Sequence, residues 1–266
     1  MIFDTHTHLN FFDFDKDRDE LIKKLIESKI GIINVGTNLK SSEKAINVAN
    51  EYKDAFASVG LHPLNIAYNF FKSKECFLKE EEFLEDGFDY EKYKEIAMSK
   101  KVVAIGECGL DYYHKPKGVK GFEEIQKKVF IKQLDLAKEL DLPIILHCRN
   151  AFDDAYEILS KRDNKGVLHC FTGTKEDAER FTASGFYFGI NGIIFRTDLE
   201  EAIKIIPMDR ILLETDCPYL SPPKFEERNN PLSLKHVIEE LSRIKGVSIK
   251  EIEEITRQNT KDLFNI

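Results

Sequence analysis

Eight short apolar runs, each followed by a loop and then by an amphipathic helical stretch, constrain the fold of this chain more than any other feature. The runs occupy residues 2–6, 31–35, 55–59, 102–105, 143–146, 166–168, 186–189 and 210–213. They are rich in Val and Ile and do not alternate with polar residues, which is typical of parallel strands buried on both faces. Strands that alternate with helices predict an α/β fold, and eight such units predict a (β/α)8 barrel of the TIM type.

Helical patterns lie between these runs and after the last of them. They cover residues 19–28, 122–140, 151–161, 174–184, 199–206, 232–244 and 249–264, and Thr174 begins a Thr-x-x-Asp pattern typical of a helix N-cap. Because such barrels contain about 250 residues, we expect residues 1–266 to form a single domain. The stretch 65–93 is longer than a βα connection requires, and we expect it to form a partly helical surface excursion between the third and fourth strands.

Neither a membrane span nor a secretion signal is expected. No run of about 18 apolar residues occurs, and Asp4 stands where a signal peptide would be basic and then apolar. The five cysteines include no Cys-x-x-Cys pair, which favours a reduced, cytoplasmic protein. No obligate protein partner is evident.

Polar side chains follow seven of the eight runs, at the points where the strands are expected to end. They are His6 and His8, His62, Glu107, His147, His169, Asn191, and Glu214 with Asp216. In a barrel these positions converge at the C-terminal mouth, where the active sites of such enzymes lie. Buried ionisable groups are costly unless they are paired or bound to a metal, so a metal centre explains this set better than separate structural roles do.

Strand alternation decides which of these side chains face the barrel axis. His6 and His8 point the same way because one residue separates them, and together they form half of a metal site. Four cysteines each follow a ligand-type residue by one position and are therefore expected to point outward as small buried hydrophobes, not as thiolate ligands. They are Cys108, Cys148, Cys170 and Cys217.

Four histidines and two carboxylates exceed what one tetrahedral ion needs, so two divalent ions are expected. Imidazole and carboxylate donors suit Zn, Mn, Co or Ni and, with more water ligands, Mg. Two ions about 3.5–4 Å apart can share a bridging hydroxide and stabilise both the attacking and the leaving oxygen of a displacement. The set therefore predicts a hydrolase.

In these residues and the segments around them, the chain resembles the TatD family of metal-dependent deoxyribonucleases, a branch of the amidohydrolase-like barrels. The matching segments are FDTHTHL at 3–9, GLHP at 60–63, AIGECGLDYY at 104–113, LHCR at 146–149, HCFTG at 169–173, LETDCPYL at 213–220 and RN-x-P at 228–231. They span nearly the whole chain in the expected order. The chain departs from the family in its longer 65–93 stretch and in the acids Glu226 and Glu227, where the family is usually more basic.

The resemblance implies a role for each ligand-type residue. His6, His8 and Asp216 would hold one ion, and His147 and His169 would hold the other. Glu107 would bridge the two ions, and Asp216 would also act as the general base. His62 would donate a hydrogen bond to the substrate phosphate. Glu214 would either support a third, weaker ion or orient a ligand.

Three further residues are candidates for substrate binding. Arg149 lies two residues after His147 and is placed to reach a phosphate, although a salt bridge at the rim is an alternative. Arg228, in its Arg-Asn-x-Pro loop, is a candidate for the same contact with a phosphate. Tyr113 belongs to the segment 112–120, where aromatic residues beside three lysines suggest a platform for a single strand, or else a solvated loop.

The formal net charge of −8 argues at first against a polyanionic substrate. Residues 75–91, however, hold eight acids and one lysine, and the rest of the chain, with 39 acids and 38 bases, carries a net charge of −1. The acidity therefore belongs mostly to one surface stretch. What remains of the objection is that few phosphates would be bound at once, which suits a short strand end better than a long duplex.

The sequence thus predicts a divalent-metal-dependent hydrolase, and the resemblance makes it a 3′–5′ exonuclease acting on DNA, with single-stranded ends as the expected substrate. One alternative keeps the binuclear site and changes the bond, as in a deacylase or esterase acting on aminoacyl-tRNA. Many related barrels use a modified lysine as the bridge, whereas this chain offers Glu107 on the fourth strand. A second alternative is a binding protein without activity, which would be expected to have lost ligands, and all six are present.

Overall fold

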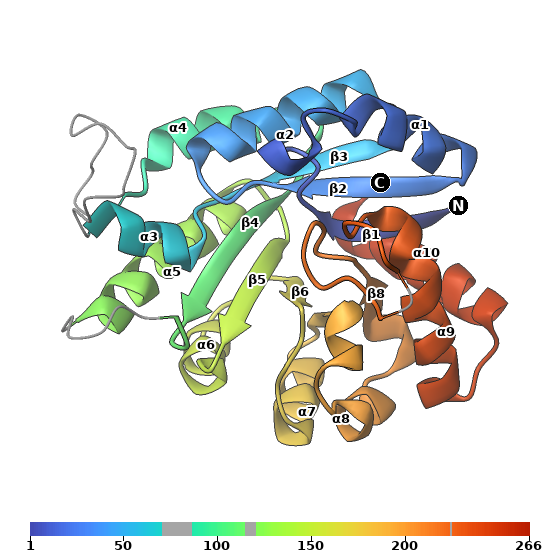
Figure 1. Ribbon diagram of the computed structural model, residues 1–266. Coiled ribbons are helices and arrows are strands. Elements are labelled where there is room, and N and C mark those ends of the chain that lie inside the picture. Colours follow the sequence, from blue (N-terminus) through green and yellow to red (C-terminus); the bar gives the residue numbers. More distant parts are fainter. Residues whose placement is uncertain (71–86, 115–120, 224) are drawn as a thin grey trace.

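The computed structural model describes residues 1–70, 87–114, 121–223 and 225–266, which form a (β/α)8 barrel (Figure 1). Eight strands pair in sequence order, each parallel to the next. They are β1 (Ile2–Thr7), β2 (Ile30–Val35), β3 (Ala55–Val59), β4 (Val102–Asp111), β5 (Ile144–Arg149), β6 (Gly166–His169), β7 (Tyr187–Ile190) and β8 (Ile211–Leu213). The predicted fold class is confirmed.

The last strand returns to the first at the mouth of the barrel. Thr7 forms a parallel bridge with Cys217. The backbone N–H of His8 donates to the carbonyl of Cys217 over 3.0 Å, and that of Asp216 donates to the carbonyl of His6 over 2.9 Å. These bonds bring the His-x-His segment and the Glu-Thr-Asp segment together although they lie at opposite ends of the sequence.

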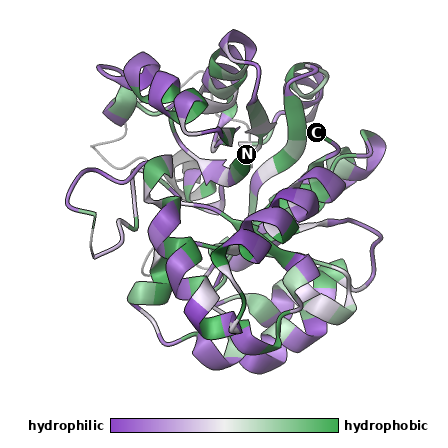
Figure 2. Ribbon diagram, turned by 90° about the vertical axis from the view of Figure 1, so that its right-hand side faces the viewer, coloured by the Kyte–Doolittle hydropathy of each residue, from purple (hydrophilic) through white to green (hydrophobic). Residues whose placement is uncertain are grey.

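Helices surround the strands, and hydrophobic and hydrophilic residues alternate in short stretches along their ribbons (Figure 2). The α-helices are α1 (Arg18–Glu27), α2 (Leu39–Glu51), α3 (Pro63–Phe70), α4 (Tyr90–Ala97), α5 (Phe122–Glu139), α6 (Phe152–Leu159), α7 (Lys175–Ala183), α8 (Glu200–Ile205), α9 (Leu234–Lys245) and α10 (Ile249–Phe264). Short 3-10 helices are η1 (Phe12–Phe14), η3 (Gly192–Phe195), η4 (Met208–Arg210) and η5 (Pro231–Ser233). The predicted N-cap is confirmed, because Thr174 accepts a hydrogen bond from the N–H of Asp177. In the described parts of the chain, no helix combines the length and the apolar character needed to cross a bilayer.

Apolar side chains from five of the strands pack together with the end of helix α10. Ile33, Val35, Val103, Ala104, Ile145, Val167 and Leu212 form one buried cluster with Leu263 and Phe264, which end helix α10. Because strand side chains alternate, the face of β5 that carries Ile145 also carries His147. The barrel therefore has a packed apolar floor and a polar mouth.

The fourth strand is longer than the apolar run that predicted it. Strand β4 continues through Glu107 to Asp111, with a register shift against β5 between Ile105 and Cys108. Glu107 is thus held inside a strand that is buried along its whole length, not in the loop that follows it.

The structure describes the two predicted loop segments only in part. The stretch 65–93 begins within α3 and ends within α4, while its residues 71–86 lie outside the described residues. The lysine-containing stretch 115–120 lies outside them as well.

Candidate metal centre

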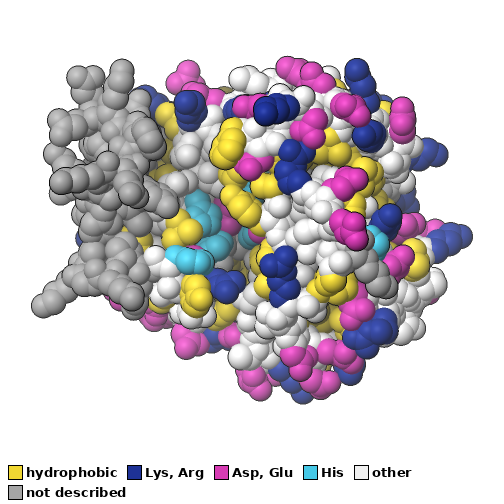
Figure 3. Space-filling model, in the orientation of Figure 1, with side chains coloured by type: hydrophobic (Ala, Val, Ile, Leu, Met, Phe, Trp, Pro, Cys, Tyr) yellow, Lys and Arg dark blue, Asp and Glu magenta, His cyan; other side chains and the backbone are white. Residues whose placement is uncertain are grey.

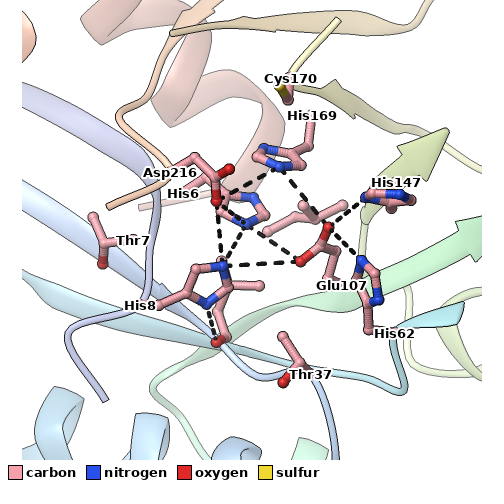
Figure 4. Close-up of polar contacts among 12 residues, drawn as sticks. His6, Thr7, His8, Thr37, His62, Glu107, His147, His169, Cys170 and Asp216 are labelled. Atoms are coloured by element: carbon pink, nitrogen blue, oxygen red, sulfur yellow. Dashed lines mark hydrogen bonds and ion pairs between the residues drawn. The ribbon is translucent and has the colours of Figure 1, made fainter. Parts of the chain in front are cut away.

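The carboxylate of Glu107 lies at the centre of the converging histidines, and its two oxygens face different groups (Figure 4). Oε2 lies 3.5 Å from Nε2 of His6 and 4.0 Å from Nε2 of His8. Oε1 faces three other histidines, at 2.9 Å from His147 Nδ1, 3.2 Å from His62 Nε2 and 3.8 Å from His169 Nε2. A carboxylate placed in this way can give one oxygen to each of two ions.

His6, His8 and Asp216 form the first group. Nε2 of His6 and Nε2 of His8 are 3.2 Å apart, and Asp216 Oδ1 lies 3.7 Å from the former and 3.4 Å from the latter. Ligand atoms about 2.1 Å from a tetrahedral ion are separated by roughly 3.4 Å. The three atoms already have this spacing, so they fit a divalent ion with little rearrangement.

The second group lies around Oε1 of Glu107. In this structure its compact triads are His6–Glu107–His169 and His62–Glu107–His147, so Glu107 is common to both. The six residues predicted as ligands therefore all meet at one place, and His62 joins them there. Figure 3 shows that histidine side chains gather together on this face of the molecule, bordered by hydrophobic side chains.

Hydrogen bonds distinguish His62 from His147, although both contact Glu107. The backbone N–H of Leu64 donates to Nδ1 of His62 over 3.1 Å, so neutral His62 carries its proton on Nε2 and donates toward Glu107. His147 has the opposite arrangement, since its Nε2 lies 3.0 Å from Oδ2 of Asp111, which only accepts when ionised. Nδ1 of His147, 2.9 Å from Oε1 of Glu107, would then be the nitrogen that loses its proton and serves as the ligand atom when an ion binds. The roles of His147 as a ligand and of His62 as a hydrogen-bond donor to substrate stay predictions.

The other ligand-type histidines are oriented in related ways. Nδ1 of His8 donates to the carbonyl of Val35 over 3.1 Å, which leaves Nε2 free for an ion. Nδ1 of His169 lies 2.9 Å from Oε1 of Glu214, which again frees Nε2. Each of these imidazoles therefore turns its other nitrogen, Nε2, toward the centre of the cluster.

Burial and the carboxylates together set the charges of the ion-free cluster. Burial lowers the pKa of His6 and that of His62. Burial also acts to lower the pKa of His147, but hydrogen bonds with Asp111 and Glu107 outweigh it and raise this pKa to about 9. Burial would raise the pKa of Glu107, but its histidine neighbours hold it well below the usual range. The ionised carboxylates suit the cluster to cations.

Two residues of this cluster were missed as functional candidates. Asp111 lies four residues after Glu107 on β4, and strand alternation would have placed both on one face had the strand been predicted to its full length. Asn229 is the other, because its side-chain amide donates to the carbonyls of Thr215 and Tyr219 and so fixes the loop that carries Asp216. Its place in the RN-x-P segment at 228–231 was a signal that this position matters, but it did not indicate these contacts.

The predicted substrate-binding residues lie in two different settings. The guanidinium of Arg149 lies over the ring of Tyr113, 4.9 Å from its centroid, and the Tyr113 side chain is 59% exposed. Among the described residues, no carboxylate pairs with Arg149. Arg228 is engaged elsewhere, since its Nη2 donates to both carboxylate oxygens of Asp17, at 2.7 and 3.0 Å. Its guanidinium also covers the ring of Phe14.

The predicted burial of the cysteines agrees with the structure for three of the four. Cys108, Cys148 and Cys217 are buried as free thiols. Cys170 is only partly buried, because it follows His169 in the left-handed backbone region, with a φ of 47°, and its Sγ lies 3.7 Å from Oδ1 of Asn191. No cysteine sulfur belongs to the groups that could hold an ion among the described residues.

Comparisons with known proteins agree with this geometry. The family model of TatD-related DNases matches residues 3–265. An uncharacterised metal-dependent hydrolase of Bacillus subtilis, YabD, is 38% identical, with 100% of both chains covered. The 3′–5′ ssDNA/RNA exonuclease TatD of Escherichia coli K12 is 32% identical over 100% of this chain and 99% of its own. Among solved structures, the TatD homologue YjjV of Escherichia coli K12 matches with a TM-score of 0.84 and 29% identity, over 100% of this chain and 98% of its own. This chain therefore belongs to the TatD-related DNase family and is a metal-dependent hydrolase.

Proposed function

We propose that this hydrolase cleaves phosphodiester bonds at single-stranded nucleic-acid ends, with DNA as the expected substrate and 3′–5′ polarity. The observation that carries the proposal is the placement of Glu107, whose two oxygens face separate histidine groups. The name of the Escherichia coli relative, a 3′–5′ ssDNA/RNA exonuclease, supports the choice of bond and substrate. The free thiols of the described cysteines suit a reducing, cytoplasmic setting.

The residues of the cluster would have different roles in such a reaction. His6, His8 and Asp216 would hold one ion, His147 and His169 the other, and Glu107 would give one oxygen to each. Two divalent cations at this place supply Lewis acidity and lower the pKa of a water molecule. Oδ1 of Asp216 lies 3.4 to 3.8 Å from three imidazoles, facing the centre of the cluster, where it can accept a proton from the attacking water.

His62 would act on the substrate and not on an ion. Its Nε2–H points into the cluster because Nδ1 is occupied by the N–H of Leu64, and its lowered pKa keeps the ring neutral at neutral pH. A donor in this position can stabilise the charge that builds up on a phosphate oxygen as the bond breaks. Substitution of His62 should therefore slow the reaction without removing the ions.

Arg149 and Tyr113 would receive the strand beside the cluster. An exposed ring supports stacking of a base, and a guanidinium without a carboxylate partner is free to bind a phosphate. A strand held by its end makes few phosphate contacts, so binding should depend weakly on salt, with a slope that corresponds to one or two such contacts. A steep dependence would contradict a substrate held by its end.

The experiment that tests this function compares two kinds of bond in one protein. Purified protein supplied with Mn²⁺ or Mg²⁺ is given a single-stranded oligonucleotide labelled at its 5′ end and, separately, an aminoacyl ester. We expect stepwise shortening from the 3′ end, loss of that activity in Asp216→Asn, and full activity in Glu157→Gln, an exposed carboxylate far from the cluster. Turnover of the ester with an intact oligonucleotide would overturn the proposal and favour a deacylase.

A further inference from the structure

Two histidines of the cluster each have one ring nitrogen against a buried carboxylate. Neither carboxylate contacts another ligand-type histidine. Asp111 backs His147 and Glu214 backs His169. Both acids are buried, with 0% and 1% of their surface exposed. Both histidines belong to the ion group that faces Oε1 of Glu107.

Asp111 is held rigidly in its place on β4. Its Oδ2 lies 3.0 Å from Nε2 of His147 and 2.8 Å from Nδ1 of His114. Its Oδ1 accepts hydrogen bonds from the backbone N–H groups of Tyr113 and His114. The backbone of Asp111 is fixed as well, by a pair of hydrogen bonds with the side chain of Gln126. The carboxylate therefore orients the His147 ring and fixes which nitrogen carries its proton.

Glu214 is held on the other side through one of its oxygens, since Oε2 is buried without a hydrogen-bond partner among the described residues. Its Oε1 accepts from the backbone N–H of Cys170 and from the amide of Asn191, both over 2.8 Å, in addition to its contact with His169. Its Oε2 lies against Gly189, where an added Cβ would come within 2.2 Å of that oxygen. A glycine on β7 thus leaves the space that this carboxylate occupies.

The histidines of the other group have no such support. Nδ1 of His8 donates to the neutral carbonyl of Val35. Nδ1 of His6 is buried and has neither a hydrogen-bond partner nor a nearby carboxylate among the described residues. Nδ1 of His169 also lacks a hydrogen bond of normal geometry, but it lies 2.9 Å from a carboxylate oxygen of Glu214. An imidazole that donates to a carboxylate is a stronger ligand than one that donates to a carbonyl, and the carboxylate adds negative charge near the ion.

We infer that the two ion sites are unequal, and that Asp111 and Glu214 are positioning residues that make the site of His147 and His169 the tighter one. That site fills first and keeps its ion, whereas the site of His6, His8 and Asp216 fills second and exchanges its ion. The inference rests on the two-ion part of the proposed function and is independent of which bond is cleaved. It also assigns Glu214 to orienting His169 and not to a third ion.

The test is a metal titration of protein stripped with a chelator, with Co²⁺ as the probe. Visible absorption and calorimetry at fixed pH should resolve a tight step and a weaker step, one equivalent each. Asp111→Asn and Glu214→Gln keep the shape of the side chain but remove its charge, and each should weaken the tight step by about 10- to 100-fold. The weak step should change by less than about threefold.

Two further variants identify the steps. His8→Ala should abolish the weak step and leave the tight one, and Gly189→Ala should mimic Glu214→Gln by displacing the same carboxylate. Asp177→Asn is the matched control, because Asp177 is a buried acid that caps helix α7 away from the cluster. Circular dichroism establishes that each variant is folded before the titration.

Several results would overturn the inference. They are two steps of equal affinity, equal weakening of both steps by Asp111→Asn and Glu214→Gln, no weakening by either, or loss of the tight step in His8→Ala. A third equivalent of Co²⁺ that disappears in Glu214→Gln would overturn the role given to Glu214. Because no substrate is used, unequal steps in a protein that fails to degrade DNA would contradict the proposed function alone.

Discussion

The carboxyl group of Asp4 accepts two hydrogen bonds from Thr215, one from its backbone N–H over 3.0 Å and one from its hydroxyl over 2.6 Å. The residues are 211 positions apart in the sequence, on strand β1 and on the loop after β8. Asp4 lies two residues before His6, and Thr215 lies one residue before Asp216. This buried pair therefore sets the distance between two ligands of the first ion.

Loss of the Thr215 hydroxyl should affect both stability and metal binding. Thr215→Val leaves an oxygen of Asp4 without its closest donor, which should lower the free energy of unfolding by about 1–3 kcal/mol. Urea denaturation of the ion-free protein measures this change, and the Co²⁺ titration should show a weaker second step. Thr256→Val removes a buried hydroxyl that donates to a carbonyl within α10, and it should leave both Co²⁺ steps unchanged.

Metal binding should release protons and should strengthen as the pH rises. Burial acts to lower the pKa of His169, but Glu214 and Asp216 outweigh it and raise that pKa to about 10, while that of His147 is about 9. Both rings are therefore protonated at pH 7.5 without an ion and must lose a proton to bind one. Calorimetry in two buffers with different ionisation enthalpies should show more than one proton released per chain, and zero release would be inconsistent with this account.

The same raised pKa values set the pH dependence of the ion-free fold. A histidine whose pKa is higher in the folded than in the unfolded state stabilises the fold fully below its unfolded value of about 6.5. That contribution is lost as the pH rises through about 9 for His147 and about 10 for His169. The ion-free protein should thus unfold more easily at pH 10 than at pH 6. Thermal unfolding with a chelator present measures this difference. A higher unfolding temperature at pH 10 than at pH 6 would contradict the prediction.

Tyr113 should contribute to substrate binding through its ring alone. Tyr113→Ala should raise the KM for a single-stranded oligonucleotide by about fivefold or more, because stacking of one base contributes about 1–3 kcal/mol. Tyr113→Phe keeps the ring and should leave KM unchanged. Steady-state kinetics of both variants provides the measurement, and an equal KM in Tyr113→Ala and wild type would remove Tyr113 from the proposed site.

Arg149 and Arg228 should differ although both were predicted to bind phosphate. Arg149→Ala should raise KM and make binding less sensitive to salt, because its guanidinium has no carboxylate partner in the described part of the chain. Arg228→Ala should instead lower the free energy of unfolding by about 1 kcal/mol, since Arg228 pairs with Asp17 and covers Phe14. A larger KM effect in Arg228→Ala than in Arg149→Ala would reverse this assignment.

The sequence predicted the barrel and its mouth because both depend on local patterns. Apolar runs mark buried parallel strands, and a polar residue just after a run marks the mouth, which is how His147 and His169 were found. What these patterns do not contain is the direction of each imidazole. That direction depends on partners far away in the sequence, such as Asp111 for His147 and Glu214 for His169.

Arg228 is a second residue whose contacts the sequence did not predict. Its motif suggested a phosphate contact, which stays a prediction, and it did not predict that Asp17 of the loop before α1 lies against its guanidinium. A contact between residues 211 positions apart leaves no trace in the spacing of either motif. A motif therefore identifies candidate functional residues, but it does not predict which distant residues they contact.

The bridging role of Glu107 is the central claim, and metal content together with activity tests it most directly. Elemental analysis should find two divalent ions in the wild-type chain. Glu107→Gln should hold at most one and should lose at least 100-fold in the rate of oligonucleotide cleavage, while Glu157→Gln should match the wild type. Two ions and full activity in a folded Glu107→Gln protein would contradict the account.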